Sequence, residues 1–168
     1  MRYALTPLLV MMMGATAAQA VLSHQPAKAT SAMAAATQET EYGMPGNAKD
    51  ARRIVEIRLL DTMRIEPARL RVTQGQTVRL RIRNSGVVPH EFVLGTEKEI
   101  AEHRDMMRTM PTMKSADANA ASVAPGGTAE LVWRFSRPGM FLYACLIPGH
   151  WEAGMQGTVT VTAAAKSK

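Results

Sequence analysis

The short segment from Cys145 to Met155 constrains the fold more than any other part of this 168-residue chain. Cys145 is the only cysteine, His150 follows it after four residues, and Met155 comes four residues later. For their three side chains to meet at one point, Cys145 must end a strand and the chain must return within a tight loop. Pro148 and Gly149 are suitable residues for the first turn of that loop.

A thiolate, an imidazole and a thioether are three of the four ligands of a trigonal copper site with a weak axial methionine. The fourth ligand should be a histidine from another strand, and His90 lies between two apolar, strand-like runs. Soft sulfur ligands suit Cu(I) and imidazole suits Cu(II), so this ligand set serves both oxidation states. We therefore expect one type 1 copper ion per chain, bound by His90, Cys145, His150 and Met155, and single-electron transfer through it.

The segment resembles the C-terminal ligand loop of the cupredoxins, the family of plastocyanin and azurin. The resemblance extends over roughly residues 51–163. Its further motifs are Gly75-Gln76-Thr77-Val78, Asn84-Ser85-Gly86, Pro125-Gly126-Gly127 and Gly157-Thr158-Val159-Thr160-Val161. The chain looks most like the small periplasmic cupredoxins associated with bacterial copper tolerance. In those proteins Glu-Phe follows the first histidine, as in His90-Glu91-Phe92, whereas plastocyanins and azurins usually have Asn at the position of Glu91.

Alternating apolar residues predict several short strands separated by turns. The clearest alternations are Val78, Leu80 and Ile82; Leu131, Trp133 and Phe135; and Phe141, Tyr143 and Cys145. Such a pattern predicts an all-β protein folded as an antiparallel β-sandwich. The Greek-key connection of the strands is what the cupredoxin resemblance implies.

One segment, near residues 96–112, predicts a short helical insert. Thr96 and Glu99 are spaced as a capping box, and Pro111 ends the pattern. Apolar and histidine side chains form one helical stripe of Ile100, His103, Met106, Met107 and Met110. The favoured interpretation is that this stripe packs against the sandwich. The alternative is a second, softer Cu(I) site made by His103, Met106, Met107, Met110 and Met113.

The amino-terminal region predicts export and a leader. Residues 1–20 combine a basic start, an apolar run and a small-residue cleavage site, as a signal peptide does. We expect a periplasmic protein with no membrane span after cleavage. Residues 21–50 are rich in Ala, Thr, Ser, Gln, Gly and Pro and show no periodicity, which predicts a disordered leader before a domain at 51–163 and a tail at 164–168.

The lone cysteine has two other interpretations, a buried structural residue or a nucleophile. The spacing of His150 and Met155 favours copper over both, and a nucleophile would need an orienting partner that the sequence does not indicate. The four histidines, at positions 24, 90, 103 and 150, form no His-x-His pair. Multicopper oxidases and copper nitrite reductases need more ligands than this, so we expect no enzymatic activity.

The chain carries a formal net charge of +6 at pH 7. A basic protein meets acidic partners faster, so we expect an acidic redox partner that docks near Trp151 and His150. No motif indicates binding to nucleic acid, and a monomer is the default expectation. Two functions stay open: an electron carrier, and a copper-sequestering or copper-delivery protein that uses the methionine stripe.

Overall fold

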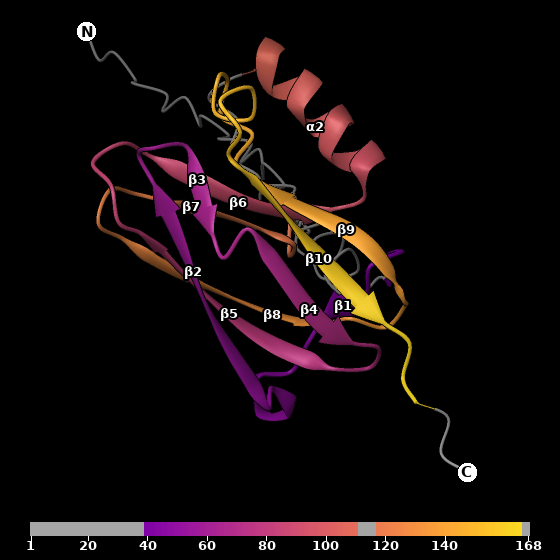
Figure 1. The fold of residues 1–168 in the computed structure, drawn as a ribbon. Helices are drawn as coiled ribbons and strands as arrows, with labels where there is room; N and C mark the ends of the chain where they lie inside the picture. The colour runs from indigo at the N-terminus through magenta and orange to yellow at the C-terminus, as the bar shows by residue number, and fades with distance from the viewer. Residues whose placement is uncertain (1–38, 111–116, 166–168) are drawn as a thin grey trace, which may run out of the picture.

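The computed structural model describes residues 39–110 and 117–165 of the chain. In these residues two five-stranded sheets pack face to face, and a helix lies outside one of them (Figure 1). The elements are β1 (Met44–Pro45), the 3-10 turn η1 (Ala48–Asp50), β2 (Arg53–Leu60), β3 (Arg64–Glu66), β4 (Arg69–Thr73), β5 (Thr77–Asn84), β6 (His90–Gly95), α2 (Glu97–Thr109), β7 (Ala120–Val123), β8 (Thr128–Arg134), β9 (Gly139–Ala144) and β10 (Gln156–Thr162). The predicted β-sandwich with one helical insert is thus confirmed.

The first sheet has the strand order β1-β8-β5-β2-β3, and the second has β4-β10-β9-β6-β7. Most neighbouring strands are antiparallel, but β2 pairs with β5 and β4 pairs with β10 in parallel. The prediction of an antiparallel sandwich needs correction at these two pairs. Side-chain alternation is the same for either strand direction, so the sequence pattern could not separate them.

The core lies between the sheets and contains the alternating residues that the sequence pattern predicts. Trp133, Phe135, Phe92 and Tyr143 are among its largest fully buried side chains. The rings of Phe92 and Tyr143 stack with their centroids 5.4 Å apart, which joins β6 to β9. This rigid packing supports the end of the sandwich at which β6 begins and β9 finishes.

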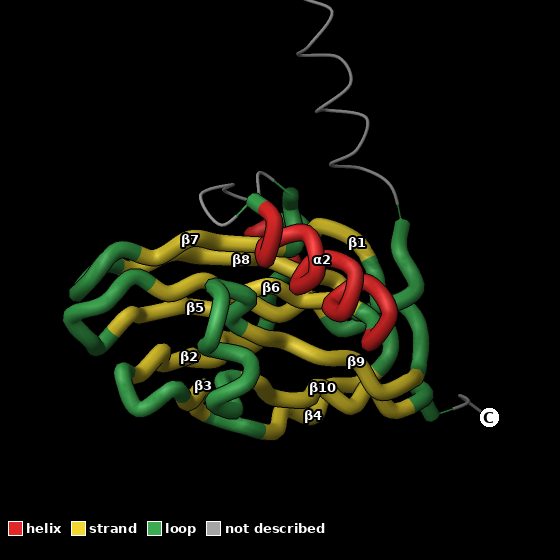
Figure 2. The backbone as a smooth tube through the Cα atoms, turned by 90° about the horizontal axis from the view of Figure 1, so that it is seen from above, coloured by secondary structure: helices red, strands yellow, loops and turns green. Residues whose placement is uncertain are grey.

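Strand β6 is buried along its whole length, because it has the core on one face and α2 on the other. Helix α2 packs across β6 and β9 on the outer face of the second sheet (Figure 2). The predicted capping box is present, with the Thr96 side chain accepting from the Glu99 backbone and the Glu99 side chain accepting from Thr96. Only Thr96 separates β6 from α2, so the helix is held close to the strand that begins with His90.

The prediction of a disordered leader as far as residue 50 is wrong for its last part. Tyr42 is 2% exposed, and its ring stacks on Trp133 at 5.4 Å between centroids. Strand β1 then pairs with the end of β8. One aromatic residue in a polar segment gives no periodicity, which is why the pattern did not reveal this contact. The predicted signal peptide, residues 21–38 and positions 166–168 of the predicted tail lie outside the described residues.

Within the part of the chain that the structure describes, no helix has the length and apolar character needed to cross a membrane.

Candidate metal centre

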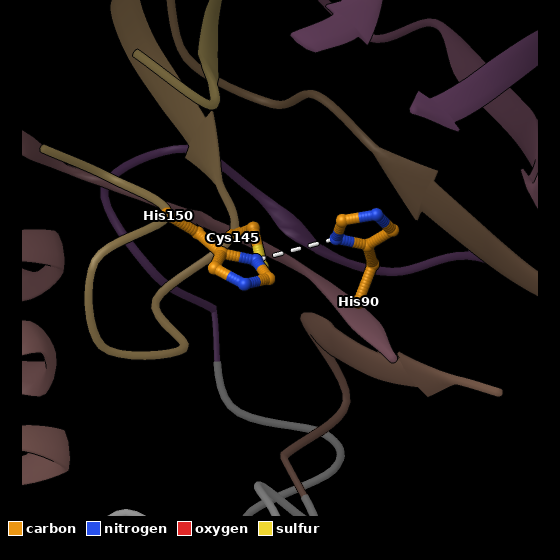
Figure 3. Close-up of side chains that lie close together, drawn as sticks. All are labelled: His90, Cys145 and His150. Atoms are coloured by element: carbon orange, nitrogen blue, oxygen red, sulfur yellow. Dashed lines mark hydrogen bonds between the residues drawn. The ribbon is translucent and has the colours of Figure 1, made fainter. Parts of the chain in front are cut away.

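Three of the predicted ligands come together at one end of the sandwich (Figure 3). His90 begins β6, Cys145 directly follows β9, and His150 lies in the loop before β10. The Nδ1 atom of His150 is 3.3 Å from both the Nδ1 of His90 and the Sγ of Cys145. The lone pairs of two imidazole nitrogens and a sulfur at such distances repel one another unless a proton or a cation lies between the atoms. A donor set of two imidazoles and one thiolate fits copper.

The turn that returns the chain from Cys145 to His150 has the geometry expected from its residues. The N–H of His150 donates to the carbonyl of Ile147 at 3.0 Å. Pro148 occupies the second position of this turn, and Gly149, with φ of 88°, occupies the third. Proline followed by a residue of positive φ is typical of a type II turn. The predicted role of Pro148 and Gly149 as turn residues is therefore confirmed.

Met155, the fourth predicted ligand, is fully buried in the same core cluster as Cys145. Its N–H donates to the carbonyl of His150 at 3.0 Å, and its carbonyl accepts from the N–H of Cys145 at 3.1 Å. Arg64 of β3 stabilises the same loop by donating a hydrogen bond to the carbonyl of Ala153 at 2.7 Å. We refer to residues 145–155 as the ligand loop; its shape is set by its own main chain and by this arginine.

Burial controls the protonation of the candidate ligands. Desolvation raises the pKa of the Cys145 thiol to about 11, and the neighbouring Glu91 charge adds to this, while backbone N–H groups partly oppose it. Desolvation, followed by the proximity of His90, lowers the pKa of His150. The imidazole of His150 is therefore held in its neutral, ligand-competent form near neutral pH. A cation that replaces the thiol proton would relieve the desolvation of the sulfur.

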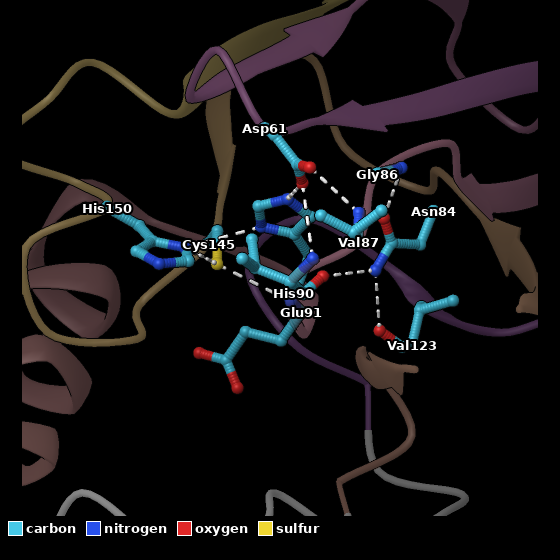
Figure 4. A network of polar contacts seen from close by, with 10 residues as sticks. Asp61, Asn84, Gly86, Val87, His90, Glu91, Val123, Cys145 and His150 are labelled. Atoms are coloured by element: carbon cyan, nitrogen blue, oxygen red, sulfur yellow. Dashed lines mark hydrogen bonds and ion pairs between the residues drawn. The ribbon is translucent and has the colours of Figure 1, made fainter. Parts of the chain in front are cut away.

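The turn before His90 is held by a buried asparagine. The Nδ2 of Asn84 donates to the carbonyls of Val88 at 2.8 Å and Val123 at 3.1 Å, and its Oδ1 accepts from the N–H of Gly86 at 2.9 Å (Figure 4). A fully buried side chain with all of these partners fixes the entry of the chain into β6.

Asp61, which the sequence did not single out, contacts His90 from the turn between β2 and β3. Its Oδ1 lies 3.2 Å from the Nε2 of His90, and its Oδ2 accepts from the N–H of Val87 at 2.7 Å (Figure 4). The Val87 N–H is the main cause of a lowered pKa at Asp61, with smaller contributions from Val88 and His90. No sequence signal could reveal this contact, because Asp61 is distant from His90 in the chain and carries no motif.

Glu91, the departure from the usual asparagine, occupies a buried position that links the two ligand-bearing segments. Its N–H donates to the Sγ of Cys145 at 3.4 Å, and its Oε1 accepts from the N–H of Leu146 at 2.9 Å. Burial raises the pKa of Glu91, while the Leu146 N–H and the nearby His103 oppose this shift. The carboxyl group thus links β6 to the ligand loop.

The packing of α2 buries one residue of the predicted second copper site and leaves two others exposed. Ile100 and Met107 are buried in a cluster with Val93, Ala144 and Leu146, which agrees with the favoured interpretation of the stripe as a packing face. Met106 and Met110 are 39% and 49% exposed. Met113 lies outside the described residues. Met107 is therefore held in the packing face, and the second Cu(I) site remains a prediction.

His103 and Arg104 of α2 interact with residues next to the predicted ligands, His103 with the charge of Glu91 and Arg104 with Trp151. The Nε2 of His103 is buried and has no hydrogen-bond partner among residues 39–110 and 117–165. The guanidinium carbon of Arg104 lies 5.7 Å from the ring centroid of Trp151, in a cation–π contact. Trp151 of the ligand loop is therefore partly covered by the helix.

Comparisons with known proteins agree with this architecture and with copper as the metal. The model of the family described as copper binding proteins, plastocyanin/azurin family, matches residues 54–162. The copper-resistant cuproprotein CopI of Rubrivivax gelatinosus is 47% identical over 147 residues, covering 88% of this chain and 89% of that protein. CopI of Pseudomonas aeruginosa is 35% identical over 160 residues, covering 78% of this chain and 88% of its own length.

Among solved structures, auracyanin A, a blue copper protein of Chloroflexus aurantiacus, superposes with a TM-score of 0.57 at 26% identity. The superposition covers 65% of this chain and 98% of auracyanin A. The predicted resemblance to cupredoxins related to copper tolerance is confirmed by these matches. The chain belongs to the plastocyanin/azurin family of copper-binding proteins, with CopI copper-resistance cuproproteins among its relatives.

Proposed function

We propose that this protein carries single electrons on one type 1 copper ion bound by His90, Cys145, His150 and Met155, in the periplasm and in the setting of copper tolerance. The observation that carries the proposal is the convergence of His90, Cys145 and His150, each of which offers one ligand atom within 4.8 Å of the others. When bound there, copper supplies a Cu(II)/Cu(I) couple. The family's main use in electron transfer rather than catalysis supports this function, and the name of the CopI relatives supports the physiological setting.

The chain provides a metal site whose geometry should change little when the charge of the bound copper changes. Cys145 and Met155 are fully buried and His90 is 1% exposed, so water is kept from three of the four ligands. The main-chain bonds of the ligand loop and the Asn84 network hold those ligands in place whatever the cation's charge. A rigid site that excludes water needs little structural change when the copper gains or loses an electron.

His150 is the partly exposed member of the set and marks the edge through which we propose electrons pass. Trp151 lies beside it under the guanidinium of Arg104, so an aromatic surface and a positive charge occur together. This combination would suit transient docking of an acidic redox partner. Exchange of the Trp151 side chain for aspartate should slow electron exchange with such a partner while leaving the copper spectrum intact.

Copper loading of the mature protein tests the proposed site directly. We expect one copper per chain, an intense thiolate-to-copper absorption band in the visible range and a narrow hyperfine splitting in the EPR spectrum. Met155→Leu should keep the band and change the reduction potential, because leucine fills the same space without a sulfur. A Met155→Leu protein with an unchanged spectrum and potential would remove Met155 from the ligand set.

The second candidate function is sequestration or delivery of copper through an additional Cu(I) site on α2. The buried His103 Nε2, which has no partner in the described part of the chain, favours this function. The burial of Met107 in the helix interface argues against its release for metal binding. A Met106→Leu/Met110→Leu double variant separates the two functions, because it leaves Met107 packed. Loss of a second Cu(I) equivalent in this variant would support copper handling, and an unchanged single equivalent would exclude a site at these two residues.

A further inference from the structure

We propose that Asp61 is a positioning residue of the metal centre, whose carboxylate orients His90 for copper and favours the Cu(II) state. This inference rests on the function proposed above and extends it to a residue outside the ligand set. It follows from the contacts of Asp61, from the burial of His90 and from the space that Gly86 leaves open.

The side chain of Asp61 bridges two segments that meet at the metal centre. It extends from the β2–β3 turn, where Oδ2 accepts from the N–H of Val87 at 2.7 Å and Oδ1 lies 3.2 Å from the Nε2 of His90. The side chain of His90 is 0% exposed, whereas that of Asp61 is 36% exposed. Water therefore does not reach the His90 ring, and in the described part of the chain the carboxylate is the partner of its Nε2.

This contact determines which ring nitrogen of His90 is free to bind a metal. A neutral imidazole carries one N–H, and a carboxylate can only accept a hydrogen bond. The proton is therefore held on Nε2, and the lone pair remains on Nδ1. That Nδ1 is the atom 3.3 Å from the Nδ1 of His150. A carboxylate behind a metal-binding histidine has the same effect in other metal sites, where its loss lowers metal affinity by roughly 10–100-fold.

The sequence leaves room for the carboxylate at Gly86. A Cβ atom added to Gly86 would lie 1.7 Å from Oδ1 of Asp61, much closer than any non-bonded contact. The N–H of Gly86 is held by Asn84 at 2.9 Å, so the turn cannot easily move aside. Because Gly86 has no side chain, Asp61 can approach both the turn and the ring of His90.

The charge of Asp61 has a second effect, on the balance between the two copper states. A nearby negative charge stabilises Cu(II) more than Cu(I), because the interaction grows with the charge of the cation. Partial exposure of the carboxylate weakens this effect without reversing its sign. Loss of Asp61 should therefore raise the reduction potential.

The experiment measures the reduction potential, the Cu(II) affinity and the His90 ring nitrogens of four variants against the wild-type protein. Asp61→Ala removes both the contact and the charge, Asp61→Asn keeps an acceptor oxygen without the charge, and Gly86→Ala displaces an unaltered Asp61. Glu56→Gln is the matched control, because it removes an exposed charge of β2 that pairs with Arg81 and not with His90. Nitrogen-15 NMR of the Cu(I) and metal-free proteins reports whether His90 carries its proton on Nε2.

We expect Asp61→Ala and Gly86→Ala to lower Cu(II) affinity by roughly tenfold or more. Both should also raise the potential and weaken the Nε2–H signal of His90. Asp61→Asn should raise the potential and retain more of that signal, while Glu56→Gln should match the wild type. An Asp61→Ala protein with the thiolate-to-copper band and an unchanged potential would overturn this inference alone. A wild-type protein without that band would overturn the proposed function, and the inference with it.

Discussion

The ligand loop and helix α2 lie against each other, but different forces hold them. The ligand loop is fixed by directional hydrogen bonds, among them those of its own main chain, of Glu91 to the Leu146 N–H and of Arg64 to the Ala153 carbonyl. Helix α2 is attached mainly through the buried side chains of Ile100 and Met107.

The two kinds of contact have different consequences, one for the placement of the ligand atoms and the other for the stability of the fold. Hydrogen bonds depend strongly on distance and angle, so they fix the positions of ligand atoms closely. Apolar contacts depend on buried area and tolerate small displacements, so they contribute stability without dictating where a metal-binding atom lies. We infer that the loop sets the properties of the metal centre, and that α2 covers Glu91 and strengthens the fold.

The largest effect should come from Cys145→Ala, which removes the thiolate. We expect loss of the intense visible band and of most copper affinity, because no other sulfur anion is present in the chain. The metal-free protein should remain folded, because only one buried sulfur atom is lost. Visible spectroscopy with a copper titration tests the first point, and circular dichroism tests the second. An intense band that survives in this variant would contradict the assignment of Cys145.

Met107→Ala should test the role assigned to α2. Truncation of a fully buried methionine lowers the free energy of unfolding by about 2–4 kcal/mol through lost contacts and the cavity it leaves. The visible spectrum of the copper form should stay unchanged if the helix contributes stability alone. Urea unfolding of the metal-free protein measures the first quantity. The control is Met106→Ala, at a 39% exposed position, which should change stability by less than about 0.5 kcal/mol.

Glu91→Ala should affect both properties, because Glu91 lies between the two regions. It leaves the buried N–H of Leu146 without its acceptor, which costs about 1–3 kcal/mol of stability. It also loosens the loop beside Cys145, so we expect a broader EPR signal from the bound Cu(II). Glu91→Gln keeps an acceptor oxygen and should retain most of the stability. If Glu91→Ala lowers stability with no change in the EPR signal, Glu91 belongs with α2 and not with the ligand loop.

The smallest effect should appear at alkaline pH and far from the metal centre. Burial, with a contribution from Glu99, raises the pKa of Tyr42 to about 12 from an ordinary value of 10.0. A raised folded-state pKa gives stability that is complete below about pH 10 and is lost as the pH rises towards 12. The loss should be on the order of 2 kcal/mol. Tyr42→Phe should remove this part of the pH dependence.

Chemical denaturation at pH 9 and pH 11 measures this difference. Tyr143, whose pKa is also raised by burial, contributes in the same direction in both proteins and so does not obscure the comparison. If the free energy of unfolding falls by the same amount from pH 9 to pH 11 in the wild type and in Tyr42→Phe, the segment around Tyr42 does not stay packed on the sandwich in solution.

Much of the sandwich could be predicted from sequence because its strands alternate strictly, as in β5 with Val78, Leu80 and Ile82. The assembly of Cys145 and His150 could be predicted because residue type and spacing in the ligand loop are restrictive, and that of His90 because it lies between two apolar, strand-like runs. Strand direction could not be predicted, since alternation carries no information about it. The contact of Asp61 with His90 also could not be predicted, because it joins the β2–β3 turn to the first residue of β6, which only the folded sheets bring together. Glu91 was visible as a departure from a pattern, but its hydrogen bond to Leu146 required the structure.

The position of β10 has a consequence for how the molecule is assembled. This final strand lies inside the second sheet, between β4 and β9, and not at its edge. Until β10 is in place, β4 has no partner in that sheet, and the carbonyl of Met155 cannot meet the N–H of Cys145. The pairing of β4 with β10 joins distant parts of the chain, and such contacts form slowly because a large loop must close first. We infer that the second sheet and the metal centre are completed together once β10 is in place, so a chain that ends before β10 should lose both.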